Sequence, residues 1–505
     1  MRERHLRVPI VALMAALATT LVAFVLPGAA TSAPPGCSTR TNTTYQQLLS
    51  CVTVEGVREH QAAFQAIADA NHDPFAPGSR AAGTDGYTGS VDYVAGLLED
   101  AGYTVTLDEF AYEFAGASLR QTAPITATYA TGAFTGTGEG TVSASVTAVD
   151  VNLVLPRDPV TSGCEAADFA GFPAGTIALV QRGTCSFGIK AANAQAAGAA
   201  AVVVFNQGNT PDRSGLIVGT LLPDGASVTI PVVGASFANG AALAQPGSSA
   251  TVSVVLESRP QVNVIAEKTG TNDDNVVMAG AHLDSVQEGP GINDNGSGSA
   301  ALLETALMMA KVKPQNTLRF AWWGAEEDGL LGSEAYVDGL DQTERDRIAM
   351  YLNYDMVGSP NYVFFVYDGD NSDGVGAPAG PTGSAAIEKL YEGFYAARNI
   401  QSKGTDFSGR SDYGPFIAVG IPAGGLFTGA EGIKTAAEAV TWGGTAGQQY
   451  DPCYHLACDT FANNSNTALG VNSDLIAYAQ LTYAFSTESV NGVPGRIVPG
   501  SPPTP

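Results

Sequence analysis

Three groups of acidic and histidine side chains each follow an apolar stretch that is typical of a buried strand. They are His282 and Asp284 after VVMAGA, Glu326 and Glu327 after LRFAWWGA, and Asp355 after AMYLNY. In open α/β sheets, ligands bind outside the carboxyl ends of the strands, so we expect these side chains to converge on one crevice. Imidazole nitrogen and carboxylate oxygen are both ligands that zinc accepts. The pattern therefore predicts a metal site at this edge of a sheet.

Two more segments extend this set of candidate ligands. Asp294 lies in the Gly-rich turn INDNGSGSAALLE directly before a predicted helix, and His455 lies within CYHLACD. Five ligands indicate two metal ions, and two zinc ions about 3.5–4 Å apart require a bridging carboxylate to offset their repulsion. The adjacent Glu326 and Glu327 cannot both point the same way from an extended segment. One of them is therefore free to act as a base while the other binds metal.

Simpler interpretations fit single members of this set. A Glu-Glu pair is usually part of a solvated face, but this pair follows a strand that is too apolar to be exposed. The turn GINDNGSGS could be a strand-to-helix loop with a helix cap, or a phosphate cradle. It lacks the lysine of a P-loop, and no dinucleotide fingerprint precedes it. His282 and His455 differ from ordinary loop histidines only through their acidic neighbours.

Strand and helix patterns alternate from residue 261 onward, which is typical of a largely parallel sheet covered by helices on both faces. The strands include NVVMAGA, TLRFAWWGA and AMYLNYD, and the helices between them are SGSAALLETALMMAKV and LLGSEAYVDGL. Before this region, residues 57–110 indicate a helix, a turn, a helix and a strand. The intervening residues 118–258 are rich in Thr, Ala, Gly and Val and contain short alternating runs. They predict a separate β-rich insert in an α/β fold.

The first residues have the pattern of a secretory signal peptide. Three arginines precede the apolar run VPIVALMAALATTLVAFVL, and the small residues PGAATSA follow it. We expect cleavage near Ala30 or Ala33 and export of the mature chain, which then has no membrane association. An uncleaved membrane anchor is the alternative, because the run is nearly long enough to span a bilayer.

Charge and cysteine content limit the partners and the compartment. The chain has 24 Lys and Arg against 49 Asp and Glu, and its net charge of −25 repels a phosphate backbone, so we expect no nucleic-acid partner. Its six cysteines form an even set that suits an oxidising, extracellular compartment. Sequence proximity favours three local disulfides, namely Cys37–Cys51, Cys164–Cys185 and Cys453–Cys458.

Six motifs together resemble one enzyme family. AHLDSV, GINDNGSGSAALLE, WWGAEEDGLLGSEAY, NYDMVG, GRSDYGPF and YHLACD are similar, in order and spacing, to those of the secreted two-zinc aminopeptidases of the aminopeptidase Y and bacterial leucyl aminopeptidase type. The resemblance implies a twisted mixed sheet between helices, two Zn²⁺ per chain, and removal of single residues from the free N-terminus of peptides. The segment GTIALVQRGTCSFGIKAANAQAAGAAAVVVFNQ resembles a protease-associated domain. Such a domain is not catalytic; it could limit access to the cleft, bind substrate or partners, or add stability.

The resemblance also implies a role for each candidate residue. One zinc is held by His282 and Asp355, the other by Glu327 and His455, and Asp294 bridges them. Glu326 is the general base that takes a proton from the water or hydroxide between the metals, whose pKa zinc lowers toward about 7. Tyr454 stabilises the oxyanion of the tetrahedral intermediate. Asp284 is suited to orient the imidazole of His282 through a hydrogen bond, and Asp459 to orient that of His455.

Substrate contacts are expected from the remaining motifs. Phe427 is a candidate wall of the pocket for the N-terminal side chain, and an apolar wall favours Leu, Met or Phe. Arg410 is a candidate substrate contact, and the free α-amine is expected near Glu326 and Asp355. A carboxypeptidase or dipeptidase on the same scaffold is the alternative, and Arg410 could supply the cation that it needs. A receptor-like protein without metals is a further alternative, although it would lack ligands that are present here.

The resemblance divides the 505 residues into five parts. Residues 1–33 are the signal peptide, 34–117 the N-terminal part of the peptidase domain, and 118–258 the inserted domain. Residues 259–490 form the C-terminal part of the peptidase domain with the metal site, and 491–505 form a Pro-rich tail. We expect the mature chain to be a monomer.

Overall fold

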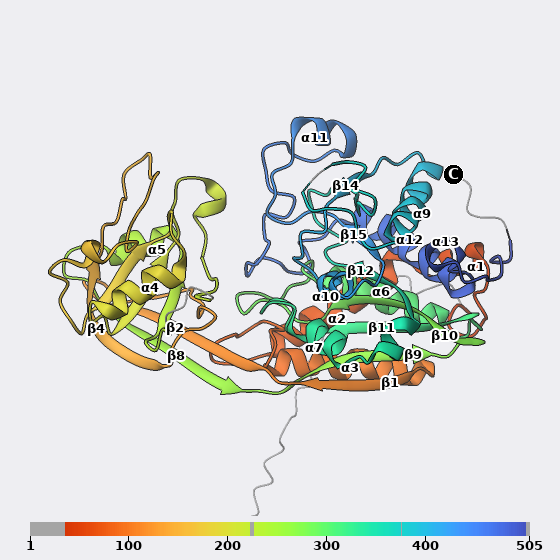
Figure 1. Ribbon diagram of the computed structural model, residues 1–505, viewed down its shortest axis with the longest axis horizontal. Helices are drawn as coiled ribbons and strands as arrows, with labels where there is room; N and C mark the ends of the chain where they lie inside the picture. The colour runs from red at the N-terminus through yellow and green to blue at the C-terminus, as the bar shows by residue number, and fades with distance from the viewer. Residues whose placement is uncertain (1–35, 223–226, 375, 501–505) are drawn as a thin grey trace, which may run out of the picture.

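The computed structural model describes residues 36–222, 227–374 and 376–500, so the predicted signal peptide lies outside the described residues. The chain forms two lobes joined by a pair of long strands (Figure 1). The larger lobe contains both ends of the described chain, and the smaller lobe is built from residues 113–258.

The larger lobe contains an eight-stranded mixed sheet. In spatial order its strands are β1 (Thr104–Phe110), β9 (Gln261–Lys268), β11 (Asn316–Trp323), β10 (Asn272–His282), β12 (Ile348–Tyr354), β15 (Ala423–Phe427), β13 (Phe365–Tyr367) and β14 (Lys403–Thr405). The four central strands β11, β10, β12 and β15 are parallel. On one side β9 runs antiparallel to β11, and the edge strand β1 runs antiparallel to β9. On the other side β13 runs antiparallel to β15. The α/β prediction with a mixed, largely parallel sheet is confirmed.

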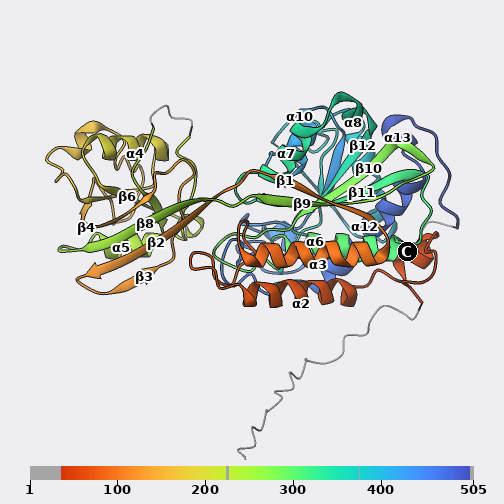
Figure 2. The same ribbon diagram turned by 90° about the horizontal axis from the view of Figure 1, so that it is seen from below.

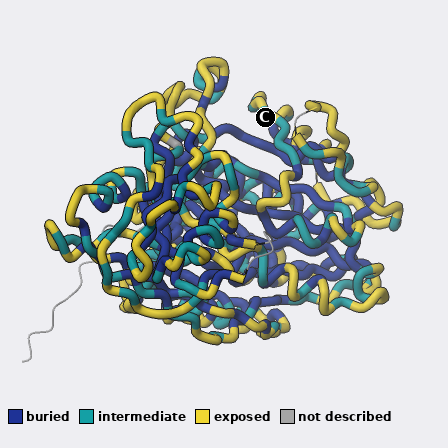
Figure 3. The backbone as a smooth tube through the Cα atoms, turned by 60° about the vertical axis from the view of Figure 1, so that its left-hand side comes forward, coloured by how far each residue is buried: buried dark blue, intermediate teal, exposed yellow. Residues whose placement is uncertain are grey.

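Helices cover both faces of this sheet (Figure 2). One face carries α2 (Val54–Ala70), α3 (Asp85–Ala101), α6 (Gly296–Met309), α9 (Ser384–Ala397) and α12 (Asn466–Phe485), and the other carries α7 (Leu331–Gly339) and α10 (Tyr413–Ala418). Successive strand residues alternate between the two cores: Trp322 packs on the first side and Trp323 on the second, both fully buried. Because both faces are covered, β11 and β12 are mostly apolar and every residue of both strands is buried. Figure 3 shows buried backbone in the interior and exposed backbone around it.

The smaller lobe contains a seven-stranded sheet with a core of its own. Its strands in spatial order are β3 (Ala127–Tyr129), β2 (Glu113–Ala123), β8 (Ser249–Ser258), β4 (Gly140–Ala148), β5 (Ile177–Gln181), β6 (Ala201–Phe205) and β7 (Val232–Ala235). Two short helices, α4 (Phe187–Ala196) and α5 (Phe237–Leu243), pack against it. The predicted helix followed by a buried strand in IKAANAQAAGAAAVVVFNQ corresponds to α4 and β6.

The two lobes are joined where β1 leads into β2 and β8 leads back into β9 (Figure 2). Five buried residues from both sides of this junction form one apolar cluster: Ala82, Phe110, Tyr112, Phe114 and Ala325. In addition, the hydroxyl of Tyr112 donates a hydrogen bond to Oδ2 of Asp328 at 2.7 Å. The junction therefore packs directly against the segment that follows β11.

All three predicted disulfides are confirmed: Cys37–Cys51, Cys164–Cys185 and Cys453–Cys458. Among the helices of the described ranges, none is long and apolar enough to cross a membrane.

Candidate metal centre

His282 and two carboxylates meet at the carboxyl ends of two adjacent parallel strands. His282 is the last residue of β10, and Asp355 directly follows β12. Nε2 of His282 lies 3.3 Å from Oδ1 of Asp355 and 3.3 Å from Oδ1 of Asp294. These three side chains could share one cation.

His455 forms a second group with the opposite side of the same aspartate. Its Nε2 lies 3.2 Å from Oδ2 of Asp294 and 3.0 Å from Oε2 of Glu327. Asp294 thus faces a different histidine with each of its two oxygens, an arrangement in which a carboxylate could bridge two metal ions.

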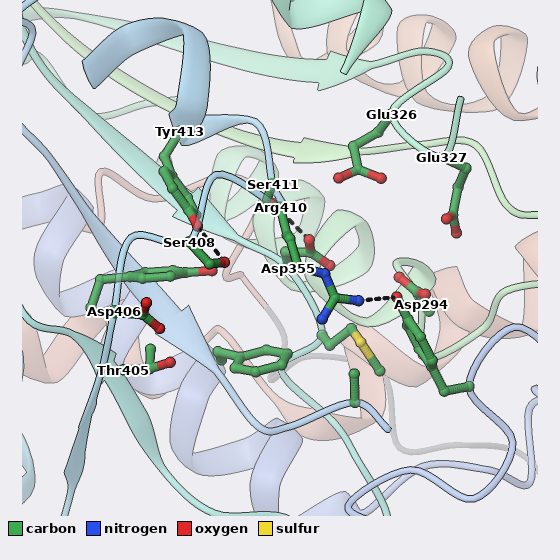
Figure 4. A pocket seen from close by; sticks show the side chains of 15 residues that line it. Asp294, Glu326, Glu327, Asp355, Thr405, Asp406, Ser408, Arg410, Ser411 and Tyr413 are labelled. Carbon is green, nitrogen blue, oxygen red and sulfur yellow. Dashed lines mark hydrogen bonds between the residues drawn. The ribbon is translucent and has the colours of Figure 1, made fainter. Parts of the chain in front are cut away.

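Glu326 lies next to these groups and faces the pocket (Figure 4). Its Oε2 is 3.9 Å from Nε2 of His282, which is farther than either aspartate oxygen. Burial raises the pKa of Glu326 well above its ordinary value. Burial also raises the pKa of Glu327, to about 7. The two neighbouring glutamates point to different places, because Glu327 is turned toward His455.

The ligand atoms of these side chains lie close together but are not hydrogen-bonded to one another, which suits a bound divalent cation. Within the described part of the chain, Oδ1 of Asp355, Oε1 of Glu327 and Nε2 of His455 are buried and have no hydrogen-bond partner. They lie close to other ligand atoms but without hydrogen-bond geometry. Buried polar atoms are rarely left unpaired, because each costs about 1–3 kcal/mol. Two imidazoles and three carboxylates are a donor set that suits zinc.

Asp284 positions the glutamate pair. Its Oδ1 and Oδ2 accept hydrogen bonds from the backbone N–H groups of Glu326 and Glu327, each at 3.2 Å. Its Oδ1 also lies 3.6 Å from Nδ1 of His282. The fully buried carboxylate of Asp284 therefore lies between His282, a candidate ligand of the first group, and Glu327, a candidate ligand of the second.

Asp459 supports a different residue from the one we expected. Its oxygens accept hydrogen bonds from the backbone N–H groups of Asn293 and Asp294, both at 2.9 Å. In the described ranges it forms no hydrogen bond with His455. The prediction that Asp459 orients His455 has no support here, because the carboxylate lies under the Asp294 turn.

Asn295 links this turn to the end of β12. Its Oδ1 accepts hydrogen bonds from the N–H groups of Gly298 at 2.9 Å and Met356 at 3.1 Å, and its Nδ2 donates to the carbonyl oxygen of Tyr354 at 2.9 Å. The two segments approach so closely that a Cβ at Gly298 would lie 2.1 Å from that carbonyl oxygen. The helix-cap interpretation of the Gly-rich turn is correct, and the cap also brings Asp294 beside Asp355.

Rarely populated backbone conformations occur at three points of this centre. Ala325 precedes Glu326 with φ 54°, Met356 follows Asp355 with φ 56°, and His455 itself has φ 57°. Non-glycine residues seldom adopt this left-handed region, and such residues cluster at functional sites.

Comparison with known proteins identifies the family. Residues 263–480 match peptidase family M28, and residues 149–243 match the PA domain. An aminopeptidase of Pseudomonas aeruginosa is 51% identical over 429 residues, which cover 82% of this chain and 78% of that relative. The chain belongs to peptidase family M28. With its PA domain inserted, it is a metal-dependent aminopeptidase.

Two further proteins agree with this assignment. Leucine aminopeptidase 2 of Trichophyton rubrum is 46% identical to the M28 peptidase over 342 residues, covering 66% of this chain and 67% of that relative. The structure of a zinc aminopeptidase from Bacillus subtilis superposes with a TM-score of 0.65 at 26% identity. The superposition covers 85% of this chain and 94% of that one.

Tyr454 lies beside the candidate metal centre of the M28 peptidase. The ring of Tyr454 stacks on that of His455, with centroids 3.8 Å apart. Its hydroxyl accepts a hydrogen bond from Nη2 of Arg410 at 3.2 Å, and Nη1 of Arg410 donates to Oε1 of Glu431 at 2.8 Å. The disulfide between Cys453 and Cys458 closes the turn that carries both rings.

A pocket extends away from the metal centre of the M28 peptidase (Figure 4). Near the centre it is lined by Asp294, Glu326, Glu327, Asp355, Arg410, Ser411 and Tyr454. Its apolar part is formed by Met356, Phe427 and Ala430, and its remaining lining by Tyr367, Thr405, Asp406, Ser408 and Tyr413. Phe427, the predicted wall, packs on Phe365 with centroids 5.8 Å apart.

Two residues of the M28 peptidase were missed by the sequence analysis. Arg80 is fully buried, and its guanidinium donates to the carbonyl oxygens of Leu283, Pro290 and Gly291, so it braces the loop between His282 and Asp294. Ser411 donates from Oγ to Oδ2 of Asp355 at 2.7 Å. An arginine in a Gly-rich loop carries no local signal of burial, whereas Ser411 belongs to the quoted motif GRSDYGPF and could have been considered.

Proposed function

We propose that this chain is a secreted aminopeptidase that holds two zinc ions and hydrolyses the N-terminal peptide bond of peptides. The observation that carries the proposal is the position of Asp294, whose two oxygens each lie close to a different histidine. The proposed ligands of one zinc are His282 and Asp355, those of the other are Glu327 and His455, and Asp294 bridges the two. When bound, the zinc ions would acidify a water molecule and polarise the scissile carbonyl group.

Glu326 is the proposed general base. Its carboxylate takes a proton from the attacking water as the water oxygen bonds to the carbonyl carbon, and it then gives the proton to the nitrogen of the leaving amine. Its position supports this role, because it lines the pocket beside the proposed ligand His282, with Oε2 3.9 Å from Nε2 of that histidine, without being one of the proposed ligands.

Tyr454 and the carboxylates are proposed to bind the reacting ends of the substrate. The Tyr454 hydroxyl faces the pocket, where it can donate a hydrogen bond to the oxyanion of the tetrahedral intermediate. Carboxylates of Glu326 and Asp355 are proposed to hold the free α-amine. Phe427 would pack on a large apolar side chain such as Leu, and Arg410 would contact the substrate at the pocket rim.

A carboxypeptidase or dipeptidase is less well supported. It would need a cation directed at the substrate carboxylate, and Arg410 is the candidate. Both outer nitrogens of Arg410 already donate hydrogen bonds, one to Glu431 and one to Tyr454. The aminopeptidase relatives also favour an aminopeptidase over a carboxypeptidase or dipeptidase.

The test uses one peptide in three forms: with both ends free, with an acetylated N-terminus and with an amidated C-terminus. We expect acetylation to abolish cleavage and amidation to leave it unchanged, because the α-amine is the group that the enzyme holds. Metal analysis of the same preparation should find two zinc ions per chain. Release of residues from the C-terminus would contradict the aminopeptidase proposal, and a single zinc would contradict the paired-metal mechanism.

The remaining parts of the proposal concern processing and organisation. We propose that residues 1–33 are removed on export, that residues 118–258 form the inserted domain, and that the mature chain is a monomer. The mass of the exported protein and its sedimentation test the first and third of these.

A further inference from the structure

The pocket beyond Phe427 does not end in apolar side chains. Asp406, Thr405 and Ser408 line it at the far side from Glu326 and Glu327 (Figure 4). They reach it from β14 and the segment that follows, which belong to the sheet edge that runs antiparallel to β15. A pocket built only for Leu or Phe would have no use for a carboxylate at this position.

Asp406 has one oxygen that is satisfied and one that is not. Its Oδ2 accepts a hydrogen bond from the backbone N–H of Ala377 at 2.9 Å. Among the residues that the structure describes, none donates to its Oδ1 and none forms an ion pair with it. The two nearby cations are already engaged, since Lys403 pairs with Glu438 at 2.7 Å and Arg410 pairs with Glu431 at 2.8 Å.

We propose that Asp406 is a specificity-determining residue that binds the side-chain cation of a basic N-terminal residue, with lysine as the best fit. This inference rests on the proposed aminopeptidase function. The methylene chain of lysine would pack against Phe427 and Met356, as lysine stems commonly pack on apolar surface. Its ammonium group would then reach Oδ1 of Asp406 and form a charge-assisted hydrogen bond.

The same geometry distinguishes lysine from two side chains that have an apolar stem but no amine. Leucine ends two atoms short of the lysine nitrogen, so it contacts the apolar part of the pocket without covering Asp406. Norleucine has the lysine chain without the amine, so it displaces water from the carboxylate and offers no partner in return. Leaving a polar group of a site unpaired is strongly unfavourable for the substrate that causes it. We therefore expect cleavage of N-terminal lysine to be at least tenfold more efficient than cleavage of norleucine.

The first test compares kcat/KM for lysine and norleucine p-nitroanilides in the full chain with zinc bound. In Asp406→Asn the lysine-to-norleucine ratio should fall by about tenfold or more, because the charge is lost while an amide oxygen can still accept from Ala377. Asp373→Asn is the matched control. Its Oδ2 likewise accepts a backbone N–H, that of Gly404 at 2.7 Å, but it does not line the pocket, so its ratio should remain that of the wild type.

The second test moves the charge instead of removing it. Asp406→Glu lengthens the acidic side chain by one methylene, so the preferred amine should become shorter and the ornithine-to-lysine ratio should rise. A purely structural role for Asp406 would not change this ratio in that direction. If the wild type cleaves leucine p-nitroanilide and Asp406→Asn has the same lysine-to-norleucine ratio as the wild type, the inference about Asp406 is overturned, but the aminopeptidase proposal is not. A wild type that cleaves none of the substrates would overturn the aminopeptidase proposal itself.

Discussion

Asp294 and the two glutamates show how single side chains divide the chemistry of this site. Asp294 faces a histidine with each oxygen, Glu327 turns toward His455, and Glu326 remains directed at the pocket. Asp284 makes this possible, because it holds the backbone of both glutamates and lies beside Nδ1 of His282. A change in one glutamate should therefore have a different consequence from the same change in its neighbour.

Replacing Glu326 by Gln should lower kcat by a factor of about 10²–10⁴ while both metal ions stay bound. The amide keeps the shape of the side chain but cannot accept a proton. Steady-state kinetics and metal analysis of the same sample measure the two effects. The comparison variant is Glu327→Gln, which should lose metal because its carboxylate is a proposed ligand. Wild-type turnover in Glu326→Gln would remove Glu326 as the base.

At the scale of elements, the pocket wall depends on a short helix with a strong N-terminal cap. The helix α11 (Ala436–Trp442) begins at Thr435, whose N–H and Oγ both donate to Oε2 of Glu438. Lys403 and Tyr450 donate to the same carboxylate. Tyr450 in turn packs on Phe365, which contacts the proposed substrate wall Phe427.

This cap predicts a pH-dependent contribution to stability. Burial by itself raises the pKa of Glu438, but its hydrogen bonds with Lys403, Thr435 and Tyr450 outweigh burial and lower the pKa to about 2. Because the folded pKa lies below the ordinary value of 4.5, the stabilisation is complete above that pH and is lost as the pH falls toward 2. At about 1.4 kcal/mol per pKa unit, its size is on the order of 3 kcal/mol.

Urea unfolding of the wild type and of Glu438→Gln at several pH values measures this contribution. The wild type should be more stable at pH 6, and the difference between the two proteins should shrink steadily below pH 4.5. Other carboxylates, including those of the metal centre, titrate equally in both proteins and cancel in the difference. A difference that does not change with pH would show that the charge of Glu438 contributes nothing.

At the scale of the whole molecule, the two lobes have separate cores and are connected by two long strands, one formed by β1 and β2 and the other by β8 and β9. The apolar clusters of the smaller lobe share no residue with those of the larger lobe, and the junction adds a separate cluster that includes Phe114. Through Ala325 and Asp328, this junction touches the segment that contains Glu326 and Glu327. The base of the smaller lobe is therefore packed against the segment that carries Glu326 and Glu327.

Separate cores predict two thermal transitions, of which only one should respond to metal. A ligand at 100 to 1,000 times its Kd stabilises the native state by about 2.7–4.1 kcal/mol, so a chelator should lower the transition of the larger lobe by about 5–15 °C. The transition of the smaller lobe should not move. Calorimetry of the full chain with and without chelator tests this.

Two matched core variants assign the transitions. Val203 in β6 and Val277 in β10 are both fully buried on central strands, one in each lobe. Val203→Ala should lower only the metal-insensitive transition, and Val277→Ala only the metal-sensitive one. A single transition that shifts in both variants and with chelator would mean that the lobes unfold as one unit.

The sequence alone was sufficient for features that depend on local pattern. Apolar strands such as 276–281 and 318–323 were recognisable because both faces of a covered parallel sheet are buried, and polar residues therefore stand out where each strand ends. The three disulfides were predictable because their cysteines are separated by only 14, 21 and 5 residues. The inserted lobe was visible as a change of period and composition.

Only the tertiary structure decided which distant groups touch. Asp459 is only four residues from His455 in the sequence, yet its carboxylate accepts hydrogen bonds from Asn293 and Asp294, about 165 residues away, as well as from the local Asn463. Arg80 supports a loop more than 200 residues further along, and Asp406 reaches the pocket because β13 and β14 reverse direction beside β15. Such contacts depend on the path of the whole chain and on burial, and neither leaves a local pattern around a single charged residue.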